Sequence, residues 1–106
     1  MRKDYPVHTL YLGSRDGNHF LNTDSSKIKG IILKEFHHFM MFEVDGAYAG
    51  KDVKTMVIKI ASDDVDRVRR IITKLGRGMG QKGVGWEFDG QYETVMAIPP
   101  SHAVAI

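Results

Sequence analysis

The sequence predicts an α+β fold in which two helices cover one face of an antiparallel sheet. Apolar and polar residues alternate with a period of two in five short stretches, as expected of strands. In two longer stretches the apolar residues recur at helical spacing. The chain has 106 residues, 42% hydrophobic and 26% charged, so we expect one domain over residues 1–106.

The first half of the chain shows a strand, a helix and a second strand. The run from Val7 to Leu12 alternates and ends at Gly13, which predicts a strand. Candidate N-caps at Asn22–Ser25 precede apolar residues at helical spacing, which predicts a helix at roughly 25–36. Residues 38–45 alternate again and predict the second strand.

The second half shows a strand, a helix and a hairpin. Residues 54–60 alternate between apolar and polar positions, as a strand does. Ser62 can cap a second helix with acids in its first turn, and Gly76 is a natural helix stop. The two alternating runs within 84–98 flank an Asp89-Gly90 turn, a strong hairpin signal.

This order, β-α-β-β-α-β with an extra C-terminal hairpin strand, is the ferredoxin-like or split βαβ arrangement. Right-handed crossovers make the first two strands parallel, with the third antiparallel between them. Three glycine-rich connections, at 13–23, 46–54 and 76–83, then lie at one end of the sheet. This end is the predicted working surface, because loops on a rigid scaffold commonly carry function. Residues 99–106 form a C-terminal tail.

The composition excludes several classes of protein. Cysteine is absent, which rules out disulfides, thiolate metal sites and a cysteine nucleophile. No apolar run approaches the roughly 20 residues of a spanning helix, so we expect a cytoplasmic protein without a membrane partner. The 15 Lys and Arg residues nearly balance the 13 Asp and Glu residues, so the charge does not favour a nucleic-acid partner.

The histidines and hydroxyl residues do not form a recognisable metal or nucleophile site. His37 and His38 are adjacent, so on a strand they point to opposite faces. The other histidines lack an acid at ligand spacing, and we expect all five at the surface or half-buried, without metal or cofactor. Ser14, Asp16 and His19 share a loop, but nothing in the sequence fixes them as a catalytic triad.

The segment Gly76–Gly80 is open to two interpretations. Nucleotide-binding glycine loops follow a strand and precede a helix, whereas this segment follows a helix. It is either a connector that stops the helix, or a loop that contacts an anionic ligand through backbone N–H groups with Arg77 or Lys82.

The glycine-flanked Tyr48 is the most unusual feature of the sequence. Gly46 and Gly50 allow the backbone to approach a ligand closely, and the aromatic ring suits a ligand ring or a sulfonium group. Equally, Tyr48 can be a hairpin residue that covers the sheet edge. Other aromatic residues at strand positions are expected in the core or an interface: Tyr11, Trp86 and Tyr92.

Three short segments together resemble the phage S-adenosylmethionine lyases, formerly called hydrolases. They are Val44–Gly50, Lys54–Val57 and Gly80-Gln81, and the resemblance spans roughly residues 42–88. It implies a ferredoxin-like trimer that holds S-adenosylmethionine between subunits. It also implies cleavage to methylthioadenosine and homoserine lactone by the substrate's own carboxylate, without water or metal, so that the site supplies substrate pose and electrostatics.

The resemblance implies substrate contacts from Tyr48 and Gln81, with Thr55 at the start of a strand. The family's glutamate falls on Val53 here, and Asp52 is the adjacent acid that could replace it. The predicted catalytic residues are therefore Tyr48, Asp52 and Gln81. The predicted substrate-binding residues are Gly46, Gly50, Thr55, Arg77, Gly80 and Lys82.

Other functions remain open on the sequence alone. The opening Leu10–Gly13 and the strand start at Thr55 also resemble small ferredoxin-like domains of unknown function. A non-enzymatic PII-like module would hold a nucleotide or small anion at the same loops. A third class is an interaction domain that uses an edge strand or the apolar tail. Apolar residues on both faces of Phe39–Phe42 favour a homo-oligomer.

Overall fold

The computed structural model describes residues 5–14, 20–48 and 50–98, and the predicted tail at 99–106 lies outside them. Its elements are β1 (Val7–Gly13), α1 (Asn22–Leu33), β2 (Met40–Tyr48), β3 (Lys51–Ala61), α2 (Val65–Gly78), β4 (Gly83–Phe88) and β5 (Gln91–Met96). This order confirms the predicted ferredoxin-like α+β fold with its extra C-terminal strand.

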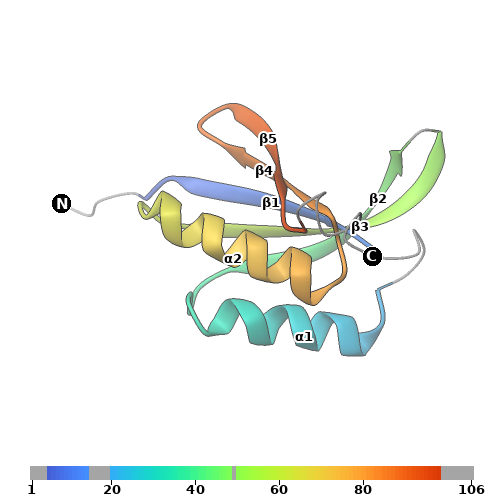
Figure 1. Ribbon diagram of the computed structural model, residues 1–106, viewed down its shortest axis with the longest axis horizontal. Helices are drawn as coiled ribbons and strands as arrows, with labels where there is room; N and C mark the ends of the chain where they lie inside the picture. Colours follow the sequence, from blue (N-terminus) through green and yellow to red (C-terminus); the bar gives the residue numbers. More distant parts are fainter. Residues whose placement is uncertain (1–4, 15–19, 49, 99–106) are drawn as a thin grey trace.

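The strands form one sheet in the order β2-β3-β1-β4-β5, and every neighbouring pair is antiparallel. Both helices lie on the same face of this sheet, while the β2–β3 and β4–β5 hairpins rise on the opposite side (Figure 1). The sheet therefore has one face covered by helices and one open face. No described helix is long and apolar enough to cross a membrane.

The core forms between α2 and the central strands. The apolar stripe of α2 is buried from Val68 to Leu75, because its residues recur at helical spacing on one side of the helix. Alternate residues of β1, β3 and β4 meet this stripe from the sheet. The largest side chains in this layer with no exposed surface are Leu10, Leu12, Ile58, Ile60, Ile71, Ile72 and Leu75.

His8 belongs to this core, so the expectation that the histidines are exposed or half-buried is wrong for this residue. Its ring has no exposed surface and stacks on Phe88 at a centroid distance of 4.2 Å. Trp86 Nε1 donates to His8 Nδ1 at 3.1 Å, and His8 Nε2 donates to the Ser62 carbonyl at 2.8 Å. Alternation with Leu10 places His8 on the covered face, a signal that the sequence already contained.

Both helices differ from their predictions at both ends. α1 ends at Leu33 rather than near residue 36, and Asp64 rather than Ser62 is the N-cap of α2. α1 begins at Asn22, because the Leu21 backbone N–H donates to the Asp24 carboxylate at 2.9 Å and fixes an earlier first turn. α2 continues through Gly76, which was predicted to stop it. A Cβ placed at Gly76 would lie 2.2 Å from the Cβ of Ala97, so this glycine permits close packing between the helix and the chain after β5.

The connection predicted as a loop over 46–54 is instead a paired hairpin. β2 and β3 stay in register from Met40↔Lys59 to Tyr48↔Lys51, which leaves two residues for the turn. Gly50 in this turn has φ 78°, a backbone conformation that glycine adopts without strain. The predicted Asp89-Gly90 turn is confirmed, with positive φ values of 55° and 75°.

We expect Gly76→Ala and Gly30→Ala to change stability in opposite directions. Gly76→Ala should lower the free energy of unfolding by about 2 kcal/mol, because the added methyl group overlaps Ala97. Gly30 lies in α1 with nothing within 4 Å of an added Cβ, so alanine should add about 0.5–1 kcal/mol there. Urea unfolding measures both, and equal effects would contradict the packing argument.

We expect Glu35 to make stability depend on acid pH. The hydrogen bond from Arg67, at 3.1 Å, holds the pKa of the Glu35 carboxyl below its ordinary 4.5. Its stabilising effect is therefore present above pH 4.5 and is lost as the pH falls through the lowered pKa. Glu35→Gln should unfold at a lower temperature than the native protein at neutral pH, and the gap should close in acid. A gap independent of pH would refute this role.

Candidate functional site

The three predicted connections do lie at one end of the sheet. The β1–α1 connection starts at Ser14, whose backbone N–H donates to the Lys54 carbonyl at 3.0 Å, so it begins against the β2–β3 hairpin. On the other side of β1, Tyr11 pairs with Gly85, which places the α2–β4 junction at the same end. Ser14 is itself buried, while Asp16 and His19 of the rejected triad lie outside the described residues.

The β2–β3 hairpin extends past this end of the sheet as an arm, defined here as residues 45–54 without residue 49. Gly13, the last residue of β1, pairs with Thr55, so the arm has no third strand beside it. In Figure 1 the arm curves away from the helices, toward the open face. Tyr48 pairs with Lys51 next to the turn, and its side chain lies outside the description.

The register separates two of the predicted site residues. Thr55 is half-buried, and a Cβ placed at Gly46 would lie 3.6 Å from its hydroxyl oxygen, so both belong to the open face of the hairpin. Asp52 is three residues away and projects from the opposite face, where it pairs with Ala47. Within one chain, Asp52 and Thr55 therefore do not line the same pocket.

The face of the arm that carries Asp52 is acidic. Lys54 forms an ion pair with Asp45, and Glu43 and Asp52 lie close enough to add to its negative surroundings. The hydrogen bond to Asp45 is the main reason why the pKa of the Lys54 ammonium lies above its ordinary value, with Glu43 and Asp52 contributing. The Lys54 ammonium is thus close to three carboxylates on this face of the β2–β3 hairpin.

The α2–β4 junction is a helix C-cap, which favours the structural interpretation of its glycines. The Gly80 N–H donates to the Arg77 carbonyl at 3.3 Å, and the Gln81 N–H donates to the Gly76 carbonyl at 2.7 Å. Gly80 has φ 70°, so these contacts form a Schellman motif with glycine in the left-handed position. Gln81 follows the motif and is half-buried.

Arg77 and Lys82 hold the chain after β5 against this junction. Arg77 Nε donates to the Ala97 carbonyl at 2.9 Å, and the Lys82 carbonyl accepts from the Ala97 N–H at 2.8 Å. The Arg77 guanidinium is therefore engaged in the fold. The Lys82 side chain is exposed and is the cation of the junction that remains directed toward solvent.

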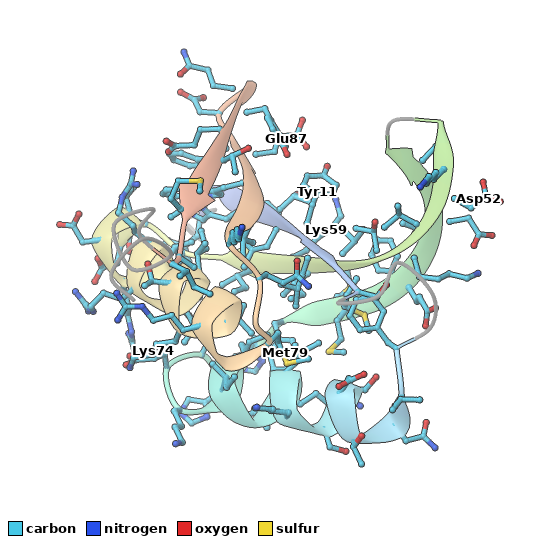
Figure 2. All side chains as sticks on the ribbon, turned by 45° about the vertical axis from the view of Figure 1, so that its right-hand side comes forward. Tyr11, Asp52, Lys59, Lys74, Met79 and Glu87 are labelled. Atoms are coloured by element: carbon cyan, nitrogen blue, oxygen red, sulfur yellow. The ribbon has the colours of Figure 1, made fainter. Side chains whose placement is uncertain are left out.

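One chain does not bring all predicted site residues together. Figure 2 shows Asp52 on the outer part of the arm and Met79, which caps α2, at the helix layer on the other side of the sheet. The arm with Asp52 thus lies apart from the junction with Gly80 and Gln81.

The described residues contain no group of three or more His, Asp or Glu side chains arranged to hold a metal ion. The sequence analysis missed the Asp45–Lys54 pair on the arm. The signal was present, because a turn at residues 49–50 places Asp45 directly opposite Lys54. Ala-Gly is a weaker turn signal than Asn-Gly or Asp-Gly, which is why the hairpin was predicted as a loop.

A comparison of folds identifies a solved structure with the same architecture, a phage SAM lyase in its apo state. The two chains superpose with a TM-score of 0.67 over 91% of this chain and 94% of the other, at 13% sequence identity. The chain therefore has the fold of a phage SAM lyase. No protein-family profile and no curated protein matches the sequence.

We expect Gly80→Ala to cost about 1–2 kcal/mol of unfolding free energy, because a Cβ is strained in the left-handed region. Gly80→Asn should cost less, since asparagine enters this region more readily. Chemical denaturation of both variants gives the comparison. Alanine as stable as glycine would mean that the cap does not depend on this backbone conformation.

Proposed function

We propose that this protein is a lyase that cleaves S-adenosylmethionine to methylthioadenosine and homoserine lactone at an interface between subunits. The observation that carries the proposal is the fold shared with the phage SAM lyase over nearly the whole length of both chains. The residues that carry the sequence resemblance lie on the arm and at the α2–β4 junction, both at the same end of this fold.

The reaction is intramolecular in the substrate. A carboxylate oxygen of the methionine part attacks its γ-carbon, the bond from that carbon to sulfur breaks, and its electron pair stays on sulfur. The sulfonium becomes a neutral thioether, so neither water nor a proton donor takes part. The protein then has to hold the carboxylate near the carbon in a bent substrate and surround the two charges that disappear.

The charges of the arm suit this substrate. S-adenosylmethionine carries a sulfonium, an ammonium and a carboxylate, and is therefore a net cation. Asp52 extends the acidic face formed with Glu43 and Asp45, which raises the local concentration of a cation. Because Asp52 and Thr55 face opposite sides, we assign Asp52 to attraction of the substrate and Thr55, with Tyr48, to contact with it.

The site needs two chains. The arm supplies Tyr48 and the close backbone of Gly46 and Gly50, and Thr55 lies at its base. The junction supplies Gln81 and the exposed Lys82. Arg77 and Gly80 support the junction through their bonds to the backbone. Because Asp52 of the arm and Met79 before the junction lie apart in Figure 2, a homo-oligomer, a trimer in this proposal, is part of the function. In this proposal the ligand is a small molecule and the protein acts in the cytoplasm.

We expect the native protein to convert S-adenosylmethionine to methylthioadenosine, measured by chromatography. Tyr48→Ala and Gln81→Ala should each lower kcat/KM at least about tenfold, because each removes a substrate contact. Asp52→Asn should raise KM and leave kcat nearly unchanged, because it removes attraction rather than contact.

Two matched substitutions lie at the other end of the sheet and serve as controls. Gln91→Ala and Asp89→Asn flank the β4–β5 turn, so both should leave the kinetics unchanged. Intact substrate after long incubation with concentrated native protein would refute the lyase. Equal losses in Gln81→Ala and Gln91→Ala would refute the assigned site.

A second candidate is a non-enzymatic module that binds the same ligand. Val53 stands where the resembling family has its glutamate, and it is a half-buried strand residue paired with Gly46. A binding module predicts that S-adenosylmethionine raises the melting temperature in proportion to the logarithm of its concentration while no product forms.

A further inference from the structure

A hollow of about 260 Å³ lies between the start of α2 and the outer part of the β4–β5 hairpin, at the end of the sheet away from the arm. Val65 of α2 and Phe88 of β4 belong to its lining. On the same side of β5, Val95 is buried near α2, whereas Glu93 and Gln91 are exposed. Because the hairpin rises away from the helices (Figure 1), α2 covers its base and leaves its outer part open.

The floor of the hollow is aromatic and is held in place from behind. Phe88 is half-buried, and the buried ring of His8 stacks on it with the two planes 15° apart. His8 is itself fixed by its hydrogen bonds with Trp86 and with the Ser62 carbonyl. Trp86 lies beside Phe88 at a centroid distance of 6.4 Å, with the planes 18° apart. Both rings line the hollow, so it has a preformed, nearly flat surface on which a planar ring can stack.

Polar groups surround this floor. The Arg69 guanidinium lies over the Trp86 ring at 4.8 Å from its centroid and donates to one carboxylate oxygen of Glu93 at 3.2 Å. Trp86 is therefore nearly covered, and Phe88 is the ring that remains accessible. The second oxygen of Glu93 has no hydrogen-bond partner within the described part of the chain. Gln91, which pairs with Phe88, adds an amide that can both donate and accept.

We propose that this hollow binds an amino-substituted purine base, which stacks on Phe88 and donates its exocyclic amino group to Glu93. Sites for drug-sized ligands measure roughly 300–1,000 Å³, so the volume of about 260 Å³ suits a single ring system. A carboxylate only accepts hydrogen bonds, so it favours a base with an amino group over a base that presents a carbonyl oxygen there. Arg69 and Gln91 supply donors for the acceptor atoms of the ring.

The charges around the hollow favour a free nucleoside over a nucleic-acid strand. Asp66 follows Val65 in α2, Asp89 follows Phe88 at the hairpin turn, and both acids are exposed. Together with Glu93 they repel a chain of phosphates. The hollow lies at the opposite end of the sheet from the arm and shares no residue with the proposed lyase site, so this inference does not depend on the proposed function.

The fluorescence of Trp86, the only tryptophan of the sequence, tests occupation of the hollow in the native protein. Adenosine and guanosine should each change it saturably, with a dissociation constant below about 1 mM. Uridine has no exocyclic amino group and should bind at least about tenfold more weakly. A short oligoadenylate should bind no more tightly than adenosine. Tighter binding that weakens with added salt would assign the hollow to a nucleic-acid strand and overturn the proposed ligand.

Two substitutions test the floor and the polar edge separately. Phe88→Leu removes the stacking surface, and Glu93→Gln replaces an acceptor oxygen by an amide donor, so each should raise the dissociation constant of adenosine about tenfold. The matched controls are Phe42→Leu on β2 and Glu87→Gln on the other face of β4, which should leave the affinity unchanged. Circular dichroism checks folding, and Glu93→Gln, at an exposed position, remains informative if Phe88→Leu is unstable.

No saturable change with either purine nucleoside, equal binding of uridine, or an equal loss in a control variant would each overturn the proposal. Tyr48→Ala separates the hollow from the proposed lyase site, because this variant should still bind adenosine. Loss of adenosine binding in Tyr48→Ala, with binding retained in Glu93→Gln, would refute the hollow and leave the lyase standing. Adenosine bound at the hollow by a protein that leaves S-adenosylmethionine intact would refute the lyase alone.

Discussion

Two helices on one side cannot cover both faces of a five-stranded sheet, and this constraint decides which strand side chains are buried. Alternation along each strand sends one set of side chains to the helices, where α2 buries a continuous stripe against β1 and β4. No helix within the described residues covers the other set (Figure 1). Phe42 and Met96, on its two edge strands, stay exposed, whereas Val57 of β3 is nearly buried. The stability of the single chain thus depends mainly on one face of its strands.

The fold also separates a well-bonded part of the proposed site from a projecting part. The α2–β4 junction is fixed by the Schellman motif at Gly80 and by the bonds from Arg77 and Lys82 to the chain after β5. Among the described residues, the arm is held by its own ladder, by the Lys54–Asp45 ion pair and by the bond from the Ser14 N–H. In the proposed site, the α2–β4 junction is therefore the preformed part, and the arm is the part that ligand or partner contacts would have to order.

The sequence predicted what depends on periodicity and failed where a tertiary contact decided. The order of elements, the sheet topology and the Asp89-Gly90 turn followed from alternation and turn residues. The end of α2 did not, because Gly76 reads as a stop unless its packing against Ala97 is known. The loops gathered at one end were predicted from strand direction alone. The opposed faces of Asp52 and Thr55 required the register, which a two-residue turn at Gly50 sets.

Because the turn of the arm has two residues, the length of the arm and the faces of its residues change together, in steps of one residue per strand. Adding one residue to each strand would lengthen it by about 3.3 Å and exchange the faces on which the residues next to the turn project. Adding two residues to each strand would lengthen it twice as far and restore the original faces. Relatives with arms of different reach can therefore keep the same contact chemistry only if their strands differ by an even number of residues.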